Sequence, residues 1–233
     1  EKIMTQSKKT VLITGAYGGL GKALAKVYHD HGFSLCLLGR DKNKLKALSK
    51  MSTNLHSCDF SDNLDIIETC EEIKKNYEKI DIIINCAAVF PISSLTDMSI
   101  KDFEKCMQIN VTAPFLLTKQ LLHKMKKGSK IINIASSSAY GGSPNTSAYC
   151  ASKHALLGLS RSWFKELKSE DIRVFCVSPG SIQTKMGKEV EKLGQLYNTF
   201  MTPQEVAEYI FFATSFEGSM VSEEIRLNRM IVQ

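Results

Sequence analysis

Short apolar stretches alternate along the chain with longer segments whose apolar residues recur at helical spacing. The apolar stretches predict buried parallel strands, because a strand covered on both faces loses the polar–apolar alternation of a half-exposed one. Strands are expected at Thr10–Thr14, Phe33–Leu38, Asn54–Cys58, Asp81–Asn85, Lys130–Ala135, Asp171–Val177 and Ile225–Asn228. Helices are expected at Ala23–His31, Lys42–Lys50, Ser61–Tyr77, Thr96–Gln108, Ala113–Lys127, Ala148–Lys165 and Pro203–Ser215. This alternation predicts an α/β fold, a doubly wound parallel sheet of about seven strands with helices on both faces.

The chain is long enough for one large α/β domain. We expect this domain to span residues 10–233, with residues 1–9 as an N-terminal extension or a remnant of an expression vector. With 43% hydrophobic and 23% charged residues, the composition is that of an ordinary globular protein. No apolar run approaches the roughly 20 residues that a membrane helix needs, and no secretory leader is recognisable. We therefore expect a cytoplasmic protein without a membrane partner.

Cysteines and net charge argue against several classes of function. The seven cysteines are scattered and never form a C-x-x-C pair, which favours a reducing compartment over a disulfide framework or a metal site. The formal net charge of +6 raises the question of nucleic acid. The lysines, however, are spread over predicted helix surfaces without the interleaved aromatic residues that base stacking requires. We expect no metal and no nucleic-acid partner, and the mild positive charge suits a phosphate-bearing cofactor.

A glycine-rich turn joins the first predicted strand to the first predicted helix. Glycines let backbone N–H groups approach a pyrophosphate closely, and the positive end of the helix dipole favours its negative charge. The spacing differs from the G-x-G-x-x-G fingerprint, but the strand–turn–helix context makes the turn a strong indication of a dinucleotide site. The residues expected to contribute to it are Gly15, Tyr17, Gly18, Gly19, Leu20 and Gly21.

The end of the second predicted strand normally meets the adenosine ribose of a bound dinucleotide. An acidic residue there would bind the 2′-hydroxyl of NAD, whereas an arginine accommodates the 2′-phosphate of NADP. Gly39 occupies the acidic position and Arg40 follows it, while Asp41 is expected to cap the next helix. The strand end therefore predicts NADP(H) in preference to NAD(H). After the third strand, Asp59 is expected to accept a hydrogen bond from the adenine amino group, with Phe60 beside it.

Tyr149 and Lys153 stand four residues apart in a predicted helix, which places the phenol and the ammonium on one face, one turn apart. A free tyrosine, with a pKa of about 10, is a poor acid–base catalyst near neutrality. A neighbouring cation lowers that pKa toward the working pH. Three serines, 136 to 138, follow the fifth strand and could hydrogen-bond a substrate oxygen beside the phenol. Tyr-x-x-x-Lys pairs arise easily by chance in a lysine-rich chain, so this pair gains meaning only from its surroundings.

Taken together, these separated features resemble the short-chain dehydrogenase/reductase family, from about Thr10 to Thr184 and more weakly to Asn228. The matching residues are Thr14-Gly15…Gly19-x-Gly21, Asp59, Asn85-x-Ala87, Asn110, Ser136, Tyr149-x-x-x-Lys153 and Pro179-Gly180-x-Ile182-x-Thr184. The resemblance implies a Rossmann-type fold that binds a nicotinamide dinucleotide. It also implies a homodimer or homotetramer, packed through the helices that hold Leu116–Leu122 and Leu156–Trp163.

The resemblance implies four catalytic residues. Tyr149 would be the general acid during reduction and the base during oxidation. Ser136 would orient the substrate oxygen; the family's serine usually precedes its tyrosine by thirteen residues, which selects this serine from the three. Lys153 would lower the pKa of the tyrosine and hold the nicotinamide ribose. Asn110 would anchor a water molecule in a proton relay through the lysine.

The resemblance also implies further contacts with the cofactor. The backbone at Ile182, together with Thr184, would hold the nicotinamide carboxamide and so set the face offered for hydride transfer. The other expected contacts are Asn85, Ala87, Pro179 and Gly180.

Some of these residues have simpler structural alternatives. Asn110 could cap or kink a helix junction, Thr184 could be the N-cap of the next helix, and Asp59 could start the helix at Ser61.

The chain also departs from the family pattern in places. Ala88 stands where the family commonly has glycine, which narrows the space near the cofactor.

Two departures concern the longer relatives and the substrate pocket. The glycine spacing also fits T-G-x-x-G-x-x-G, which is found in a longer, epimerase-like branch, but no substrate domain follows the sixth strand. Substrate selectivity normally resides in the segment that corresponds to Lys185–Met201, which is short here. We therefore expect the pocket to be open or completed by a neighbouring subunit.

The combined motifs predict an NADPH-dependent oxidoreductase. It would reduce the carbonyl of a small molecule (a ketone, an aldehyde or a 3-oxoacyl compound) to an alcohol, or catalyse the reverse, with Tyr149 as general acid or base. The alternative is a non-catalytic NADP(H)-binding regulatory or scaffold protein of the same fold. Small ketones, sugars, steroids, pterins and acyl-carrier β-ketones all stay open as substrates.

Overall fold

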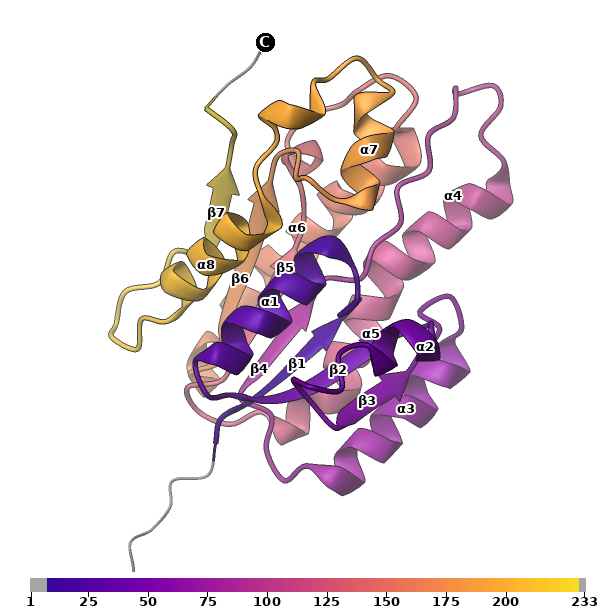
Figure 1. Cartoon of the computed structure of the whole chain (residues 1–233). Helices are drawn as coiled ribbons and strands as arrows, with labels where there is room; N and C mark the ends of the chain where they lie inside the picture. The colour runs from indigo at the N-terminus through magenta and orange to yellow at the C-terminus, as the bar shows by residue number, and fades with distance from the viewer. Residues whose placement is uncertain (1–7, 231–233) are drawn as a thin grey trace, which may run out of the picture.

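The computed structural model describes residues 8–230, and its centre is a seven-stranded, all-parallel sheet (Figure 1). The strands are β1 Thr10–Thr14, β2 Ser34–Gly39, β3 Asn54–Ser57, β4 Ile82–Asn85, β5 Lys130–Ile134, β6 Arg173–Pro179 and β7 Glu224–Leu227. They are ordered β3-β2-β1-β4-β5-β6-β7. The predicted fold class is confirmed, and the predicted strand ends differ from the observed ones by at most two residues.

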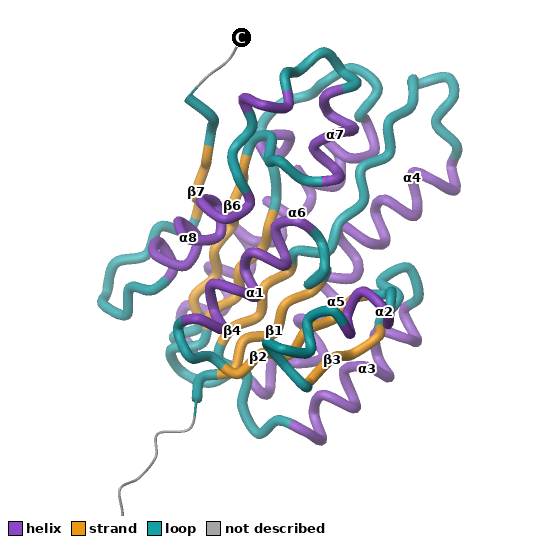
Figure 2. Tube along the Cα trace, in the orientation of Figure 1, coloured by secondary structure: helices purple, strands orange, loops and turns teal. Residues whose placement is uncertain are grey.

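Helices cover both faces of the sheet (Figure 2). They are α1 Gly19–Asp30, α2 Lys42–Lys46, α3 Asn63–Asn76, α4 Ile100–Met107, α5 Ala113–Leu121, α6 Ser147–Leu167, α7 Lys185–Glu191 and α8 Pro203–Thr214. Helices α1 and α8 pack together on one face, whereas α3, α5 and α6 pack on the other. Within residues 8–230, no helix has the length and apolar character to cross a membrane.

The core is divided into two layers by the sheet, because successive strand residues point to opposite faces. In β1, Val11 and Ile13 contact the layer of α1 and α8, while Leu12 contacts the layer of α3 and α5. All three side chains are completely buried. Burial on both faces explains why the strands are uniformly apolar, and each such side chain contributes roughly 2 kcal/mol to folding.

Several predicted helix boundaries were wrong, and capping side chains account for two of them. The helix predicted from Thr96 begins at Ile100, because Ser99 Oγ accepts the N–H of Asp102 at 3.0 Å. Likewise, α3 begins at Asn63 after its N-cap, Asp62. Two helices also end early: α2 stops at Lys46 instead of Lys50, and α5 at Leu121 instead of Lys127. Helix α7 was foreseen only through Thr184 as the possible N-cap of a next helix, without a predicted end.

The order of the strands reverses between β1 and β4, so the connections after these two strands diverge and leave a crevice. Thr14 ties the two strand ends together: its Oγ1 accepts the N–H groups of Cys86 and Ala87, each at 3.0 Å. Gly15 follows with φ +66°, and a Cβ there would lie only 2.8 Å from the Cα of Ala87. Glycine is therefore required at this position, both for the backbone conformation and for the close approach of the two segments.

Candidate active site

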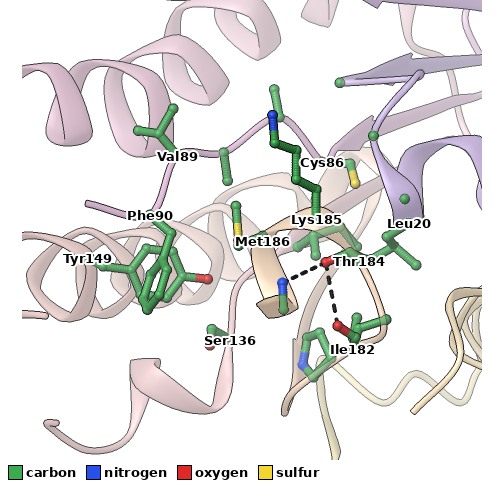
Figure 3. Close-up of a pocket in the computed structure, with 18 of the residues that line it drawn as sticks. Leu20, Cys86, Val89, Phe90, Ser136, Tyr149, Ile182, Thr184, Lys185 and Met186 are labelled. Carbon is green, nitrogen blue, oxygen red and sulfur yellow. Dashed lines mark hydrogen bonds between the residues drawn. The ribbon is translucent and has the colours of Figure 1, made fainter. Parts of the chain in front are cut away.

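A cavity of about 450 Å³ lies over this crevice, at the carboxyl ends of the strands (Figure 3). It brings together most of the residues that the sequence singles out. These are Gly15, Tyr17, Gly18, Gly19, Leu20, Gly21, Gly39, Arg40, Asp59, Phe60, Ala87, Ser136, Tyr149, Lys153, Pro179, Gly180, Ile182 and Thr184. Two predicted residues, Asn85 and Asn110, do not line the cavity.

The glycine-rich turn forms a cradle without side chains at one end of the cavity. A Cβ on Gly21 would collide with the carbonyl oxygen of Gly15, and a Cβ on Gly19 would lie 2.5 Å from Cγ2 of Thr184. The turn therefore keeps its backbone within reach of the cavity, where the first N–H groups of α1 have no partner within the helix. Such N–H groups and the helix dipole bind phosphate, so these residues fit a dinucleotide.

Tyr17 and Gly39 form the wall where the adenosine ribose is expected. A Cβ on Gly39 would lie 2.5 Å from the Tyr17 ring, and the Tyr17 hydroxyl accepts the N–H of Asp41 at 3.2 Å. The ring thus occupies the space that an acidic side chain at position 39 would need. Next to it, the exposed Arg40 forms no ion pair with any residue that the structure describes.

Asp41 is engaged elsewhere. Its Oδ1 accepts the N–H groups of Asn43 and Lys44 at 3.0 and 3.1 Å, which confirms the predicted cap. The hydrogen bonds from Lys44 hold the pKa of Asp41 below its usual value. Its carboxylate is therefore committed to the start of α2.

Asp59 lines the cavity beyond Arg40 and is half-buried. Burial alone would raise its pKa, but hydrogen bonds from the N–H and hydroxyl of Ser61 and the nearby charge of Arg40 lower it. The carboxylate is not the cap of α3, because Asp62 has that position. It thus stays an ionised acceptor at the wall of the cavity.

Ser136, Tyr149 and Lys153 meet at the other end of the cavity. Ser136 follows β5 and lines the cavity with Tyr149; its Oγ accepts the N–H of Ser138 at 3.1 Å, and its side chain acts to lower the pKa of the phenol. Tyr149 and Lys153 come from the first two turns of α6 and are 8% and 2% exposed. Lys153 Nζ donates to the carbonyl oxygen of Ile134 at 2.8 Å and lies 5.5 Å from the centre of the Tyr149 ring.

Burial dominates the electrostatics of this group. It raises the pKa of Tyr149 to about 12, although the side chain of Ser136 acts in the opposite direction. It also lowers the pKa of Lys153 to about 8. The expectation that the lysine charge would bring the tyrosine pKa toward neutrality is therefore wrong for this structure. At neutral pH the phenol is protonated, and it can donate a proton.

Phe90 is a cavity residue that the sequence did not indicate. Its ring meets the Tyr149 ring edge-on, with the centroids 4.6 Å apart and the planes at 83° (Figure 3). The contact restricts the orientation of the Tyr149 ring. No local motif marks Phe90, because the path of the loop after β4 brings it to the site.

Asn110 determines part of that path. It lies in a π-helical turn between α4 and α5, and its Oδ1 accepts the N–H of Val89 at 2.9 Å. Its Nδ2 donates to the carbonyl oxygen of Val89 and to Ser152 Oγ, both at 3.0 Å. The buried side chain thus joins the loop that carries Phe90 to the helix that carries Tyr149.

Asn85 also lies in a buried network and not in the cavity. Its Nδ2 donates to Asn133 Oδ1 at 2.8 Å and to Thr118 Oγ1 at 3.2 Å. Asn133 in turn donates to Ser160 Oγ at 2.9 Å. This network links β4 and β5 to α5 and α6 beneath the site, so the structure gives Asn85 a supporting position.

Helix α7 forms the remaining wall. Thr184 is its N-cap, with Oγ1 accepting the N–H of Gly187 at 3.0 Å (Figure 3). This cap, one of the alternatives for Thr184, holds the helix over the cavity. The substrate pocket was predicted to involve Lys185–Met201 as a segment, without single residues being named; those that line the cavity are Lys185, Met186, Gly187, Val190, Leu193 and Gln195.

Comparisons with known proteins agree with this geometry. A model of the short chain dehydrogenase family matches residues 9–193. The 3-oxoacyl-[acyl-carrier-protein] reductase FabG of Rickettsia felis is 32% identical over 223 residues, which make up 92% of this chain and 92% of that protein.

Two similar solved structures contain a nicotinamide dinucleotide. A 4-hydroxyisoleucine dehydrogenase complexed with NADH has a TM-score of 0.83 and 28% identity, over 95% of this chain and 97% of that one. A blue fluorescent protein from a metagenomic library, in complex with NADPH, has a TM-score of 0.84 and 26% identity, over 94% and 95%. The two differ in cofactor, so the choice between NADPH and NADH must be argued from this chain's own residues.

Proposed function

This chain belongs to the short-chain dehydrogenase/reductase family of oxidoreductases, and we propose that it reduces a carbonyl with NADPH, or catalyses the reverse reaction, in one domain over residues 10–233. The observation that carries the proposal is the grouping of Ser136, Tyr149 and Lys153 at one end of a cavity. A glycine cradle that fits a dinucleotide forms the other end. A proton donor, Tyr149, would therefore lie beside the space that a nicotinamide, the hydride donor, would occupy.

Each of the three residues has a separate task in the proposed reaction. The bound nicotinamide supplies the hydride. The hydroxyl of Ser136 donates a hydrogen bond to the carbonyl oxygen of the substrate and so polarises it. Tyr149, whose raised pKa keeps it protonated at neutral pH, gives its proton to the same oxygen. Lys153 stabilises the phenolate that forms, because its ammonium lies over the Tyr149 ring, 5.5 Å from the ring centre.

A non-catalytic NADP(H)-binding regulator of the same fold is the competing proposal. A regulator has no need for a serine hydroxyl, a phenol and a buried lysine on the wall of one cavity, and this chain has all three. A screen of ketones, aldehydes and 3-oxoacyl compounds, followed by NADPH absorbance, tests the choice. We expect NADPH consumption with at least one compound. Tight NADPH binding with no consumption by any compound would support the regulator.

Arg40→Asp tests the cofactor preference. The change removes the cation expected at the 2′-phosphate and introduces a carboxylate that repels it, while a free 2′-hydroxyl is accepted. We expect the Kd of NADPH to rise about 10- to 100-fold and that of NADH to stay the same or fall, as measured by fluorescence titration. The matched control is Lys42→Asp, an equally exposed cation outside the cavity. Unchanged relative affinities in Arg40→Asp would refute the assignment.

We also propose that the protein forms a homodimer or homotetramer. Most of the leucines in the helices expected at the interface are buried in the core, among them Leu117, Leu121 and Leu156. Among the exposed apolar side chains, Phe115 lies on one of these helices, α5, Phe103 lies on α4, and Tyr209, Phe212, Phe216 and Met220 lie on and after α8. Such groups on a surface are typical of association sites. Sedimentation that shows only monomer at micromolar concentration would contradict this proposal.

The cysteines support a cytoplasmic location. All seven are free in the structure, and six of them are buried. Buried thiols that never pair are typical of proteins kept in a reducing compartment. We therefore propose the cytoplasm as the place where this reaction occurs.

A further inference from the structure

Lys185 is a cation in the cavity to which neither the motifs nor the catalytic group assign a role. It is the first residue of α7 and lines the cavity, and its side chain is exposed. Figure 3 shows the side chain extended away from the helix and across the cavity. It forms no ion pair and no side-chain hydrogen bond with any of residues 8–230. An unpaired ammonium at this place is available to a ligand.

The start of α7 lies directly against the glycine cradle. Thr184, the residue before Lys185, approaches Gly19 so closely that a Cβ on Gly19 would lie 2.5 Å from its Cγ2. Gly19 is also the first residue of α1, whose N–H groups face the expected site of the cofactor diphosphate. Lys185 is therefore the next residue along a segment that touches the phosphate cradle.

The cradle itself contains no cation. Residues 15–21 carry no charged side chain, and the exposed Lys22 that follows does not line the cavity. Three cationic side chains do line it. Arg40 lies at the ribose end, and Lys153 is buried with its ammonium on Ile134. The third is Lys185, and it is the one beside the cradle.

A dinucleotide diphosphate carries two negative charges, whereas the end of a helix dipole supplies only about half a positive charge. We propose that Lys185 binds the cofactor diphosphate and supplies the charge that the glycine cradle lacks. The inference rests on the proposed function, because it assumes that a nicotinamide dinucleotide occupies the cavity. The proposed contact of Lys185 is with the diphosphate, which NADPH and NADH share. The proposed contact of Arg40 is with the 2′-phosphate, which only NADPH carries.

Titrations with three ligands separate the two cations. In Lys185→Ala we expect the Kd of NADPH and of NADH to rise by the same factor, about tenfold. Adenosine 2′-monophosphate lacks the diphosphate, so its Kd should stay unchanged. In Arg40→Asp the pattern reverses, with NADPH and adenosine 2′-monophosphate weakened and NADH retained. Isothermal titration calorimetry without substrate measures these values and excludes a contact through a phosphate on the substrate.

Two further variants control for folding and for general charge. Lys188→Ala removes an exposed cation from the same helix outside the cavity, and it should bind all three ligands as the parent chain does. Lys185→Arg keeps the charge and should retain most of the affinity for both dinucleotides. Equal affinities in Lys185→Ala and the parent chain would overturn the inference, as would an equal loss for adenosine 2′-monophosphate. A parent chain that binds neither dinucleotide would instead refute the proposed function.

Discussion

Replacing Tyr149 with phenylalanine is expected to lower kcat/KM for carbonyl reduction by about 10³-fold or more. The phenol is the group in the cavity that can give a proton to the substrate oxygen, and positioned general acids contribute factors of about 10² to 10⁴. The Kd of NADPH should change by less than about threefold, because the ring and its edge-on contact with Phe90 are retained. Steady-state kinetics and a cofactor titration on the same sample measure both effects.

A matched control for this variant is Tyr209→Phe. Tyr209 is exposed on α8 and does not line the cavity, so the same loss of a hydroxyl should leave activity unchanged. A Tyr149→Phe enzyme that keeps most of its activity would remove Tyr149 from the mechanism. Loss of NADPH binding together with activity would show that the hydroxyl holds the cofactor and is not primarily an acid.

Lys153→Met should have opposite effects on activity and on stability. Lys153 is 2% exposed, and burial lowers its pKa from 10.5 to about 8. This shift corresponds to about 3 kcal/mol of destabilisation of the folded state while the lysine is charged. Methionine removes that cost but also loses the hydrogen bond to Ile134, worth about 1 kcal/mol. We expect a gain of about 2 kcal/mol at pH 7, a rise in Tm of roughly 5 °C, and a loss of activity of at least about 10²-fold.

The gain should depend on pH in a defined direction. Below pH 8 the lysine is protonated in both the folded and the unfolded chain, so the full cost of burying its charge is present. Between pH 8 and about 10.5 the folded chain releases the proton first, and the stability of the parent chain rises toward that of the variant. Urea unfolding at pH 7 and pH 10 should therefore show a difference between the two proteins that shrinks at the higher pH.

Lys130→Met is the matched control for Lys153→Met. Lys130 is also buried, and burial lowers its pKa as well, but it lies at the start of β5, outside the cavity. It should gain stability without losing activity. If Lys153→Met is less stable than the parent chain at pH 7, then the buried ammonium is held by contacts stronger than the one to Ile134, and the pKa argument fails.

The positions of the strands and of the glycine-rich turn could be predicted from local sequence patterns. The strand sequences are apolar because both faces of the sheet are covered, and glycines mark the turn because side chains would collide there. Helix ends were less predictable. Ser94, Thr96 and Ser99 are all plausible caps, and only the geometry shows that Ser99 starts α4.

The substrate end of the site depends on contacts between distant segments. Phe90 reaches Tyr149 because Asn110, in the π-helical turn between α4 and α5, fixes the backbone of the preceding residue. Its side chain hydrogen-bonds both the N–H and the carbonyl oxygen of Val89. Lys185 reaches the cavity because Thr184 rests on Gly19. The pKa of Tyr149 could not be predicted either, since spacing along a helix reveals the neighbouring lysine but not the depth of burial.

The Tyr17 ring above Gly39 restricts which positions at the expected ribose site can acquire an acidic residue in evolution. A single substitution that places an acidic residue at position 39 would drive its side chain into that ring, which the N–H of Asp41 holds in place. The substitution becomes acceptable only after Tyr17 has been replaced by something smaller. An acidic residue at position 39 therefore requires an ordered pair of mutations, with the loss of the tyrosine first, whereas a carboxylate at the exposed position 40 does not meet this ring.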